Sequence, residues 1–273
     1  MDPLIHDARS DVQYRKSVPP RTSAVMILIH GLGAHSARWE DFSESMFKAG
    51  IACYAIELKG FGETEGVRGH VDSFSTYYGD ICALRRIAAS ENPQCKVFIV
   101  GESLGGLIAF HAAAADKSLW DGLICISPAF RSRLELRPFL YVAILIAVFL
   151  EPSKTFKLPF NSSMCSRDHE AVKRMEKDHR EHRRASARLL AETFFAQTCS
   201  RRIALEIKCP SLFLQAGNDR LVDPGYSRKI FGSLSSGDKE YIEYPEMYHA
   251  LTVDLGKEKV FTDVVGWVKK HLF

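Results

Sequence analysis

The sequence predicts an α/β fold with a mostly parallel central sheet, helices on both faces and a helical cap insertion. Six short, nearly continuous apolar runs have the composition of strands that are covered on both faces. They lie at residues 24–30, 51–57, 96–101, 122–127, 211–216 and 240–244. Helix-like segments follow after short connections, at residues 39–48, 73–89, 104–115, 226–234 and 257–271. Such alternation is typical of a parallel sheet.

One break in this alternation divides the chain into a core part at residues 1–128, an insertion at 129–207 and a second core part at 208–273. The insertion begins with an apolar stretch at 139–150, bounded by prolines that can open a helix and follow its end. A loop rich in proline and serine comes next, and then one charged helix over about residues 168–194. We expect the insertion to lie over the strand ends as a cap.

Composition limits the class of protein. The chain has 273 residues, of which 46% are hydrophobic and 25% charged, with a net charge of +3. This balance is that of an ordinary soluble domain and gives no reason to expect nucleic-acid binding. The seven cysteines include no C-x-x-C pair, and the amino terminus lacks a signal-like apolar core. We therefore expect a cytoplasmic protein with reduced thiols, with peripheral contact at membranes as a further expectation.

The strongest motif is GESLGG, which places Ser103 between an apolar strand and an alanine-rich helix. G-x-S-x-G in this setting is typical of a serine nucleophile held on a sharp turn. Gly101 and Gly105 remove side chains that would collide where the strand and helix cross. A plain glycine-rich turn is the alternative interpretation, and the strand–turn–helix context favours the nucleophile.

A second loop is suited to bind the negative charge that forms during acyl transfer. The run HGLG ends the first strong strand and places Leu32 between two glycines. Two backbone N–H groups are needed to bind the oxyanion, one from the residue after the nucleophile and one from an early strand–helix loop. Leu104 and Leu32 are the candidates.

The acid and the base are expected after the nucleophile in the chain, in that order. Asp219 follows a buried strand and is the first choice for the acid. Asp223 is the alternative, although it can instead cap the helix that begins near Pro224. His249 lies in a loop after the next strand, where a neutral imidazole could accept the proton of Ser103.

No metal or organic cofactor is expected. His179 and His182 are three residues apart and could share a metal ion, but lysine, arginine and glutamate surround them at helical spacing. That pattern is typical of a solvated helix face, and no metal-binding motif is met.

Together these motifs resemble those of monoacylglycerol lipases and related lysophospholipase-like hydrolases of the α/β-hydrolase superfamily. The segments HGLGAHSARW, IELKGFGETEG, GESLGG, GNDRLVD and YHAL occur in that family's order, and the resemblance covers about residues 25–268. It implies a triad of Ser103, Asp219 and His249, oxyanion donors at Leu32 and Leu104, and a cap over the site. Two positions depart from the family pattern: Glu102 replaces a common histidine, and Glu57 replaces a common aspartate.

The expected function is hydrolysis of carboxylic esters through an acyl-enzyme. Monoacylglycerols or lysophospholipids of medium or long chain are the first choice of substrate. The alternatives are a carboxylesterase for small or aromatic esters and a non-catalytic receptor on the same fold. The apolar stretch at 139–150 is too short to span a bilayer. It could contact an acyl chain or a membrane surface, or it could be a buried cap helix.

Overall fold

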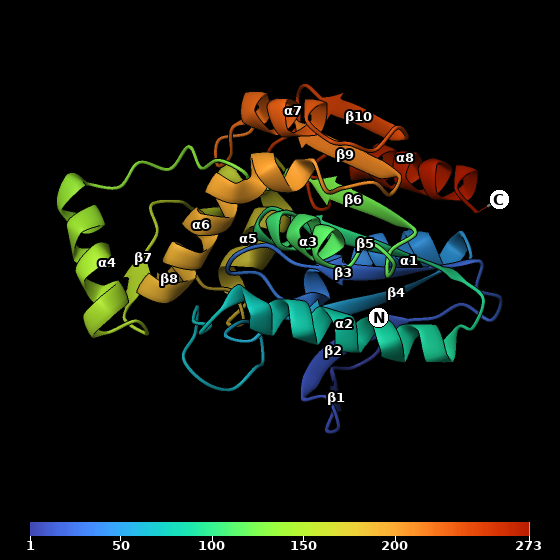
Figure 1. The fold of residues 1–273 in the computed structure, drawn as a ribbon, viewed down its shortest axis with the longest axis horizontal. Coiled ribbons are helices and arrows are strands. Elements are labelled where there is room, and N and C mark those ends of the chain that lie inside the picture. The colour runs from blue at the N-terminus through green and yellow to red at the C-terminus, as the bar shows by residue number, and fades with distance from the viewer. Residues whose placement is uncertain (273) are drawn as a thin grey trace.

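The computed structural model describes residues 1–272, and its centre is an eight-stranded sheet (Figure 1). The strands lie in the order β1-β2-β4-β3-β5-β6-β9-β10. Neighbours from β4 to β10 are parallel, whereas β1 with β2 and β2 with β4 are antiparallel. The predicted mostly parallel sheet is therefore confirmed. The strands are β1 (Ile5–Asp7), β2 (Val12–Ser17), β3 (Ala24–Ile29), β4 (Ile51–Glu57), β5 (Lys96–Glu102), β6 (Gly122–Ile126), β9 (Ser211–Ala216) and β10 (Lys239–Tyr244).

Helices cover both faces of the sheet, and each face has its own apolar core. On one face α1 and α8 bury Phe42 and Trp267 against the strands. On the other face α2, α3 and α7 do the same, with Tyr77 fully buried. Strands β3, β4 and β9 are buried at every residue, and their sequences are apolar except for Glu57 in β4 and Ser211 and Gln215 in β9. The core helices are η1 (Ser36–Trp39), α1 (Glu40–Lys48), α2 (Phe74–Glu91), α3 (Leu104–Ala115), α7 (Pro224–Gly232) and α8 (Lys257–Lys270).

The two antiparallel strands at the edge, β1 and β2, were not predicted. Their sequences are short and mostly polar, and only Val12 and Tyr14 of β2 are buried. In a strand at the edge of a sheet with one covered side, apolar and polar residues alternate only weakly. Over so few residues, this pattern cannot be told apart from that of a polar tail.

The segment that the sequence predicts as an insertion lies between β6 and β9. Its elements are α4 (Pro138–Leu150), β7 (Thr155–Lys157), η2 (Ser162–Met164), α5 (His169–Lys177), β8 (Arg184–Ser186) and α6 (Ala187–Ala204). β7 and β8 pair in antiparallel direction, and α4 stands beside them at one end of the molecule, beyond the sheet (Figure 1). In the described chain, no helix combines the length and the apolar composition that crossing a membrane requires.

The helix predicted at 139–150 is α4, but it is not a buried cap helix. Ala147 is its one buried residue. The exposed large side chains, between 53% and 80% accessible, are Phe139, Tyr141, Val142, Leu145, Ile146, Phe149 and Leu150. Half-buried Leu140, Ile144 and Val148 share a face with Ala147 at helical spacing. The helix contacts α6, so it has an inner face and a wide apolar outer face.

The prediction of a single charged helix over about residues 168–194 is wrong. The chain forms α5, leaves helical geometry at Asp178 and starts a new helix, α6, after Ser186. Asp168 and Ser186 cap the two helices with their side-chain oxygens. The residues between the two helices instead form hydrogen bonds with the core. The carbonyl oxygen of Gly69, for example, accepts the N–H of Ser186 at 2.8 Å. Tertiary hydrogen bonds here outweigh the modest helix preference of a charged sequence.

Candidate active site

Ser103 stands on the sharp turn between β5 and α3. Its backbone has φ 58° and ψ −119°, a conformation that a residue with a side chain adopts only when the surroundings impose it. The neighbouring glycines explain why this turn is possible. A Cβ on Gly105 would lie 2.1 Å from Ile29 O, and one on Gly101 would lie 2.1 Å from Gly105 O. The turn thus presents the Ser103 hydroxyl at the first turn of α3.

Ser103, His249 and Asp219 meet at the carboxyl ends of the strands, as the sequence predicts. His249 Nε2 lies 2.8 Å from Ser103 Oγ, and His249 Nδ1 lies 2.7 Å from Asp219 Oδ2. The other carboxylate oxygen of Asp219 accepts the N–H groups of Leu221 at 2.8 Å and Val222 at 3.0 Å. Asp219 and His249 are buried, while Ser103 keeps partial access to solvent.

Asp223, the alternative acid, forms its hydrogen bonds at the start of α7. Its carboxylate accepts the N–H groups of Gly225 at 3.0 Å and Tyr226 at 3.3 Å, which makes it the cap of α7. Of the two candidates, the structure brings Asp219 to the histidine.

Of the two expected oxyanion donors, Leu104 follows Ser103 directly and Leu32 lies in a loop that approaches it. Leu104 opens α3, where helix geometry leaves the first N–H groups without a partner inside the helix. Leu32 follows Gly31, and a Cβ on Gly31 would come within 3.1 Å of Ser103 Cβ. The loop is shaped by His30, whose Nδ1 lies 2.9 Å from Gly31 O. A side chain at position 31 would therefore crowd Ser103 unless one of the two residues moved by a few tenths of an ångström.

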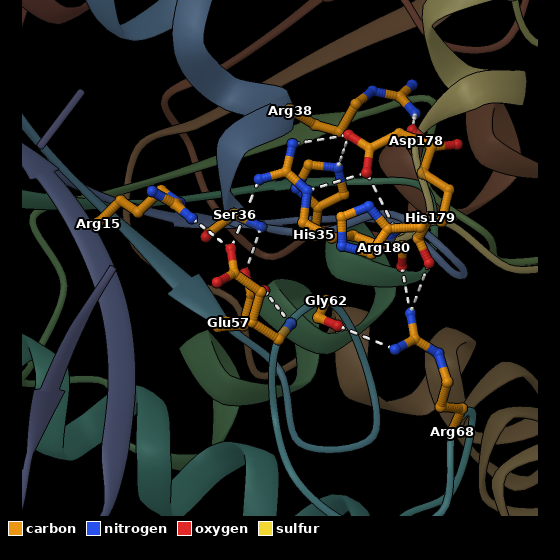
Figure 2. A network of polar contacts seen from close by, with 12 residues as sticks. Arg15, His35, Ser36, Arg38, Glu57, Gly62, Arg68, Asp178, His179 and Arg180 are labelled. Atoms are coloured by element: carbon orange, nitrogen blue, oxygen red, sulfur yellow. Dashed lines mark hydrogen bonds and ion pairs between the residues drawn. The ribbon is translucent and has the colours of Figure 1, made fainter. Parts of the chain in front are cut away.

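A polar network ties the Leu32 loop to the insertion (Figure 2). Glu57 Oε2 accepts the N–H of Ser36 at 2.6 Å. His35 Nε2 lies 3.2 Å from Asp178 of the insertion, which Arg180 contacts at 2.6 Å. Burial and the Arg180 charge lower the pKa of His35 to about 4, so its ring is neutral at pH 7. The contact between His35 and Asp178 is therefore not an ion pair at that pH.

Next to this network, the insertion packs directly on the glycine loop. Gly33 O accepts the N–H of His182 at 3.1 Å. A Cβ on Gly33, which has φ +78°, would lie 2.0 Å from His182 O. The His182 ring stacks on Phe61 with the centroids 5.2 Å apart. His182 thus belongs to the contact between insertion and core, whereas the His179 side chain is exposed and only its carbonyl oxygen accepts a hydrogen bond, from Arg68 at 3.4 Å. In the described part of the chain, no group of three potential ligands is placed to hold a metal ion.

Glu102 is a buried carboxylate next to the nucleophile, and the sequence did not reveal its role. Its Oε1 accepts the N–H of Thr252 at 3.2 Å and the Thr252 hydroxyl at 3.0 Å. Burial raises the pKa of Glu102, while the charges of Arg38 and His249 oppose the increase. Thr252 follows His249 by three residues, so Glu102 holds the loop that carries the histidine.

The charges around His249 predict the pH dependence of the reaction. Burial lowers the pKa of His249, but the charge and hydrogen bond of Asp219, with the charge of Glu102, outweigh it and raise this pKa above its ordinary 6.5. Arg38 opposes the increase. Only the neutral imidazole can accept a proton. We therefore expect kcat/KM on a soluble ester to rise about tenfold per pH unit at low pH and level off above a midpoint higher than 6.5. A profile that stays flat down to about pH 4 would contradict a histidine base.

Comparisons with known proteins agree with this arrangement. A family profile described as "Serine aminopeptidase, S33" matches residues 20–256. A monoacylglycerol lipase of Mycolicibacterium smegmatis is 26% identical over 250 residues, covering 91% of this chain and 89% of that protein. A phospholipase of Bacillus subtilis is 28% identical over 255 residues, covering 92% and 97%. The crystal structure of a Paleococcus ferrophilus monoacylglycerol lipase superposes with a TM-score of 0.87 at 28% identity, covering 95% and 99%.

These similarities confirm the resemblance to monoacylglycerol lipases and lysophospholipase-like hydrolases, and with it the α/β-hydrolase fold. The protein is a serine hydrolase of carboxylic esters. Because the matched profile spans well over half of its residues, the chain belongs to the S33 serine aminopeptidase family.

Proposed function

We propose that Ser103, His249 and Asp219 are the catalytic triad of this enzyme. His249 Nε2 takes the proton of Ser103 as its Oγ attacks the ester carbonyl, and Asp219 holds the Nδ1–H of the ring. The N–H groups of Leu32 and Leu104 donate hydrogen bonds to the negatively charged carbonyl oxygen. His249 then protonates the leaving alcohol, and water activated by the same imidazole hydrolyses the acyl-enzyme. The hydrogen-bonded chain from Ser103 to Asp219 carries this proposal.

We further propose monoacylglycerols and lysophospholipids of medium or long chain as substrates. The insertion, residues 129–207, is connected to the nucleophile through hydrogen bonds. Ser103 O accepts the N–H of Ala129 at 2.9 Å, and Ala129 O accepts from Gln197 of α6 at 2.8 Å. Helix α6 in turn packs beside α4. We assign the insertion as the cap over the site and the inner face of α4 as the part that contacts the acyl chain. The lipase and phospholipase among the relatives support this class of substrate.

The outer face of the cap is suited to rest on a membrane surface. Seven large apolar side chains of α4 and two of α6, Phe194 and Phe195, are exposed, and apolar patches of this kind mark sites of interaction. Arginines at 131, 133 and 137 precede α4, and lysines at 154 and 157 follow it. Cations beside an apolar face favour contact with anionic headgroups. We place the enzyme in the cytoplasm, which its seven free thiols suit, in transient contact with such surfaces.

Two double variants of α4 separate these roles. The inner-face change Ile144→Ser with Val148→Ser is expected to lower kcat/KM for a long-chain monoacylglycerol about tenfold or more, because each methylene that loses apolar contact costs about 0.8 kcal/mol. Butyrate ester hydrolysis is expected to change less than about twofold, since a short acyl group loses few such contacts. The outer-face change Leu145→Ser with Phe149→Ser should leave hydrolysis of dissolved substrate unchanged and reduce sedimentation with phosphatidylglycerol vesicles.

Circular dichroism should first establish that both double variants are folded. An equal loss on short and long esters in the folded inner-face variant would show that α4 does not contact the acyl chain. A carboxylesterase for small esters would then be the better assignment. Unchanged vesicle sedimentation of the outer-face variant would exclude α4 as the membrane contact.

A further inference from the structure

The loop that carries His249, residues 245–256, has no helix or strand of its own to hold it. Two buried carboxylates hold it instead. Glu102 binds Thr252 after the histidine, and Asp254 Oδ2 accepts the N–H of Tyr248, directly before the histidine, at 2.7 Å. Asp219 holds the ring at Nδ1, and the position of the backbone that carries the ring depends on where these two carboxylates are fixed.

Asp254 is fixed by the insertion and not by the core sheet. Its side chain is completely buried, and Arg167 contacts both of its oxygens. The backbone N–H of Arg167 donates to Oδ1 at 2.6 Å and its Nε–H donates to Oδ2 at 2.9 Å. Ser166 Oγ lies 3.2 Å from Oδ1. The Asp254 carboxylate thus joins the N–H of Tyr248 to Arg167, which lies 87 residues before Asp254 in the chain.

Other contacts bring the same segment onto the histidine loop. Cys165 O accepts the N–H of Ala250, the residue after His249, at 2.9 Å. Ala171 and Met175 of α5 form a small buried apolar cluster with Ala250 and Val253. Residues 165–175, which we name the buttress segment, therefore support the loop before and after the histidine.

We propose that Arg167 is a positioning residue for the reaction: through Asp254 it fixes the backbone of Tyr248 and so directs His249 toward Ser103. This inference rests on the proposed triad. It divides the insertion into two parts, an outer part with α4 that meets the substrate or membrane and a buttress segment that completes the catalytic centre. Loss of the Arg167 side chain leaves the buried Asp254 charge without its cation and frees the loop to move.

The rate at which Ser103 reacts with a small fluorophosphonate tests this proposal. That rate requires His249 to be aligned with the serine hydroxyl, but it does not require the acyl pocket. For Arg167→Ala we expect the labelling rate and kcat on a soluble butyrate ester to fall about tenfold or more, with KM within about twofold of the wild type. Arg167→Lys, which keeps the charge and one donor, should recover part of the loss.

Arg184→Ala is the matched control. This arginine lies in the same insertion and also makes two hydrogen bonds, but both are to Thr155 within the β7–β8 pair. We expect this variant to label at the wild-type rate. A second readout is the downfield proton resonance of the His249 Nδ1–H bond to Asp219, which should weaken in Arg167→Ala and persist in Arg184→Ala.

The outcomes are distinguishable. A folded Arg167→Ala protein that labels at the wild-type rate with unchanged kcat overturns the inference. If that variant does not fold, Arg167→Lys decides: slowed labelling supports the inference, and a wild-type rate overturns it. Failure of the triad itself would be recognised separately, because the wild-type protein would then not be labelled at Ser103.

Discussion

Replacement of Ser103 by alanine is expected to lower kcat for ester hydrolysis by about 10⁶-fold. The hydroxyl is the one group on the turn that lies within hydrogen-bond distance of His249, at 2.8 Å, and alanine offers nothing in its place. The fold should persist, because alanine fits wherever serine does and the strained backbone at φ 58° is set by the crossing of β5 and α3. Initial rates on a butyrate ester and the thermal unfolding midpoint measure the two effects.

Ser90→Ala provides the control for this variant. Ser90 is exposed near the end of α2, and its hydroxyl donates to Ile87 O within the same helix. Its replacement should leave hydrolysis unchanged. Substantial activity in folded Ser103→Ala, beyond trace contamination by wild-type enzyme, would exclude Ser103 as the nucleophile.

Asp219→Asn is expected to lower kcat by about 10⁴-fold. One oxygen of Asp219 receives the N–H groups of Leu221 and Val222, so the amide oxygen of asparagine will occupy that position. The NH₂ group must then face His249 Nδ1, where the carboxylate oxygen is now 2.7 Å away. This arrangement forces the ring proton onto Nε2, which can no longer accept the proton of Ser103.

Asp223→Asn is the matched control, since it makes the same chemical change four residues away. Asparagine also caps helices well, so the start of α7 should be kept and kcat should stay within about twofold of the wild type. A much larger loss in Asp223→Asn than in Asp219→Asn would show that the acid has been assigned to the wrong carboxylate.

The parallel sheet and the meeting of Ser103, Asp219 and His249 were predictable because their signals are local. Ser103 and Asp219 follow buried strands, His249 follows the half-buried edge strand β10, and the carboxyl ends of parallel strands lie at the same edge of a sheet. Two glycines beside Ser103 indicated the sharp turn directly. Chain order was then enough to place the acid and the base.

Other features were not predictable because they depend on contacts between distant segments. The charged stretch has helical composition throughout, and only its contacts with Gly33 and Gly69 show where the helix must end. Arg167 resembles any exposed arginine in the sequence, and Asp254 resembles a residue that caps a nearby helix. Their pairing across the insertion becomes evident only when the two segments are folded together.

Mass spectrometry of the intact protein after treatment with a fluorophosphonate addresses the catalytic assignment most directly. A nucleophile activated by His249 should take up one equivalent of probe. Digestion should place that adduct on the peptide that contains Ser103, and Ser103→Ala should remain unmodified under the same conditions. A wild-type protein that is folded yet takes up no probe, or whose adduct lies on another residue, would contradict a serine hydrolase that acts through Ser103.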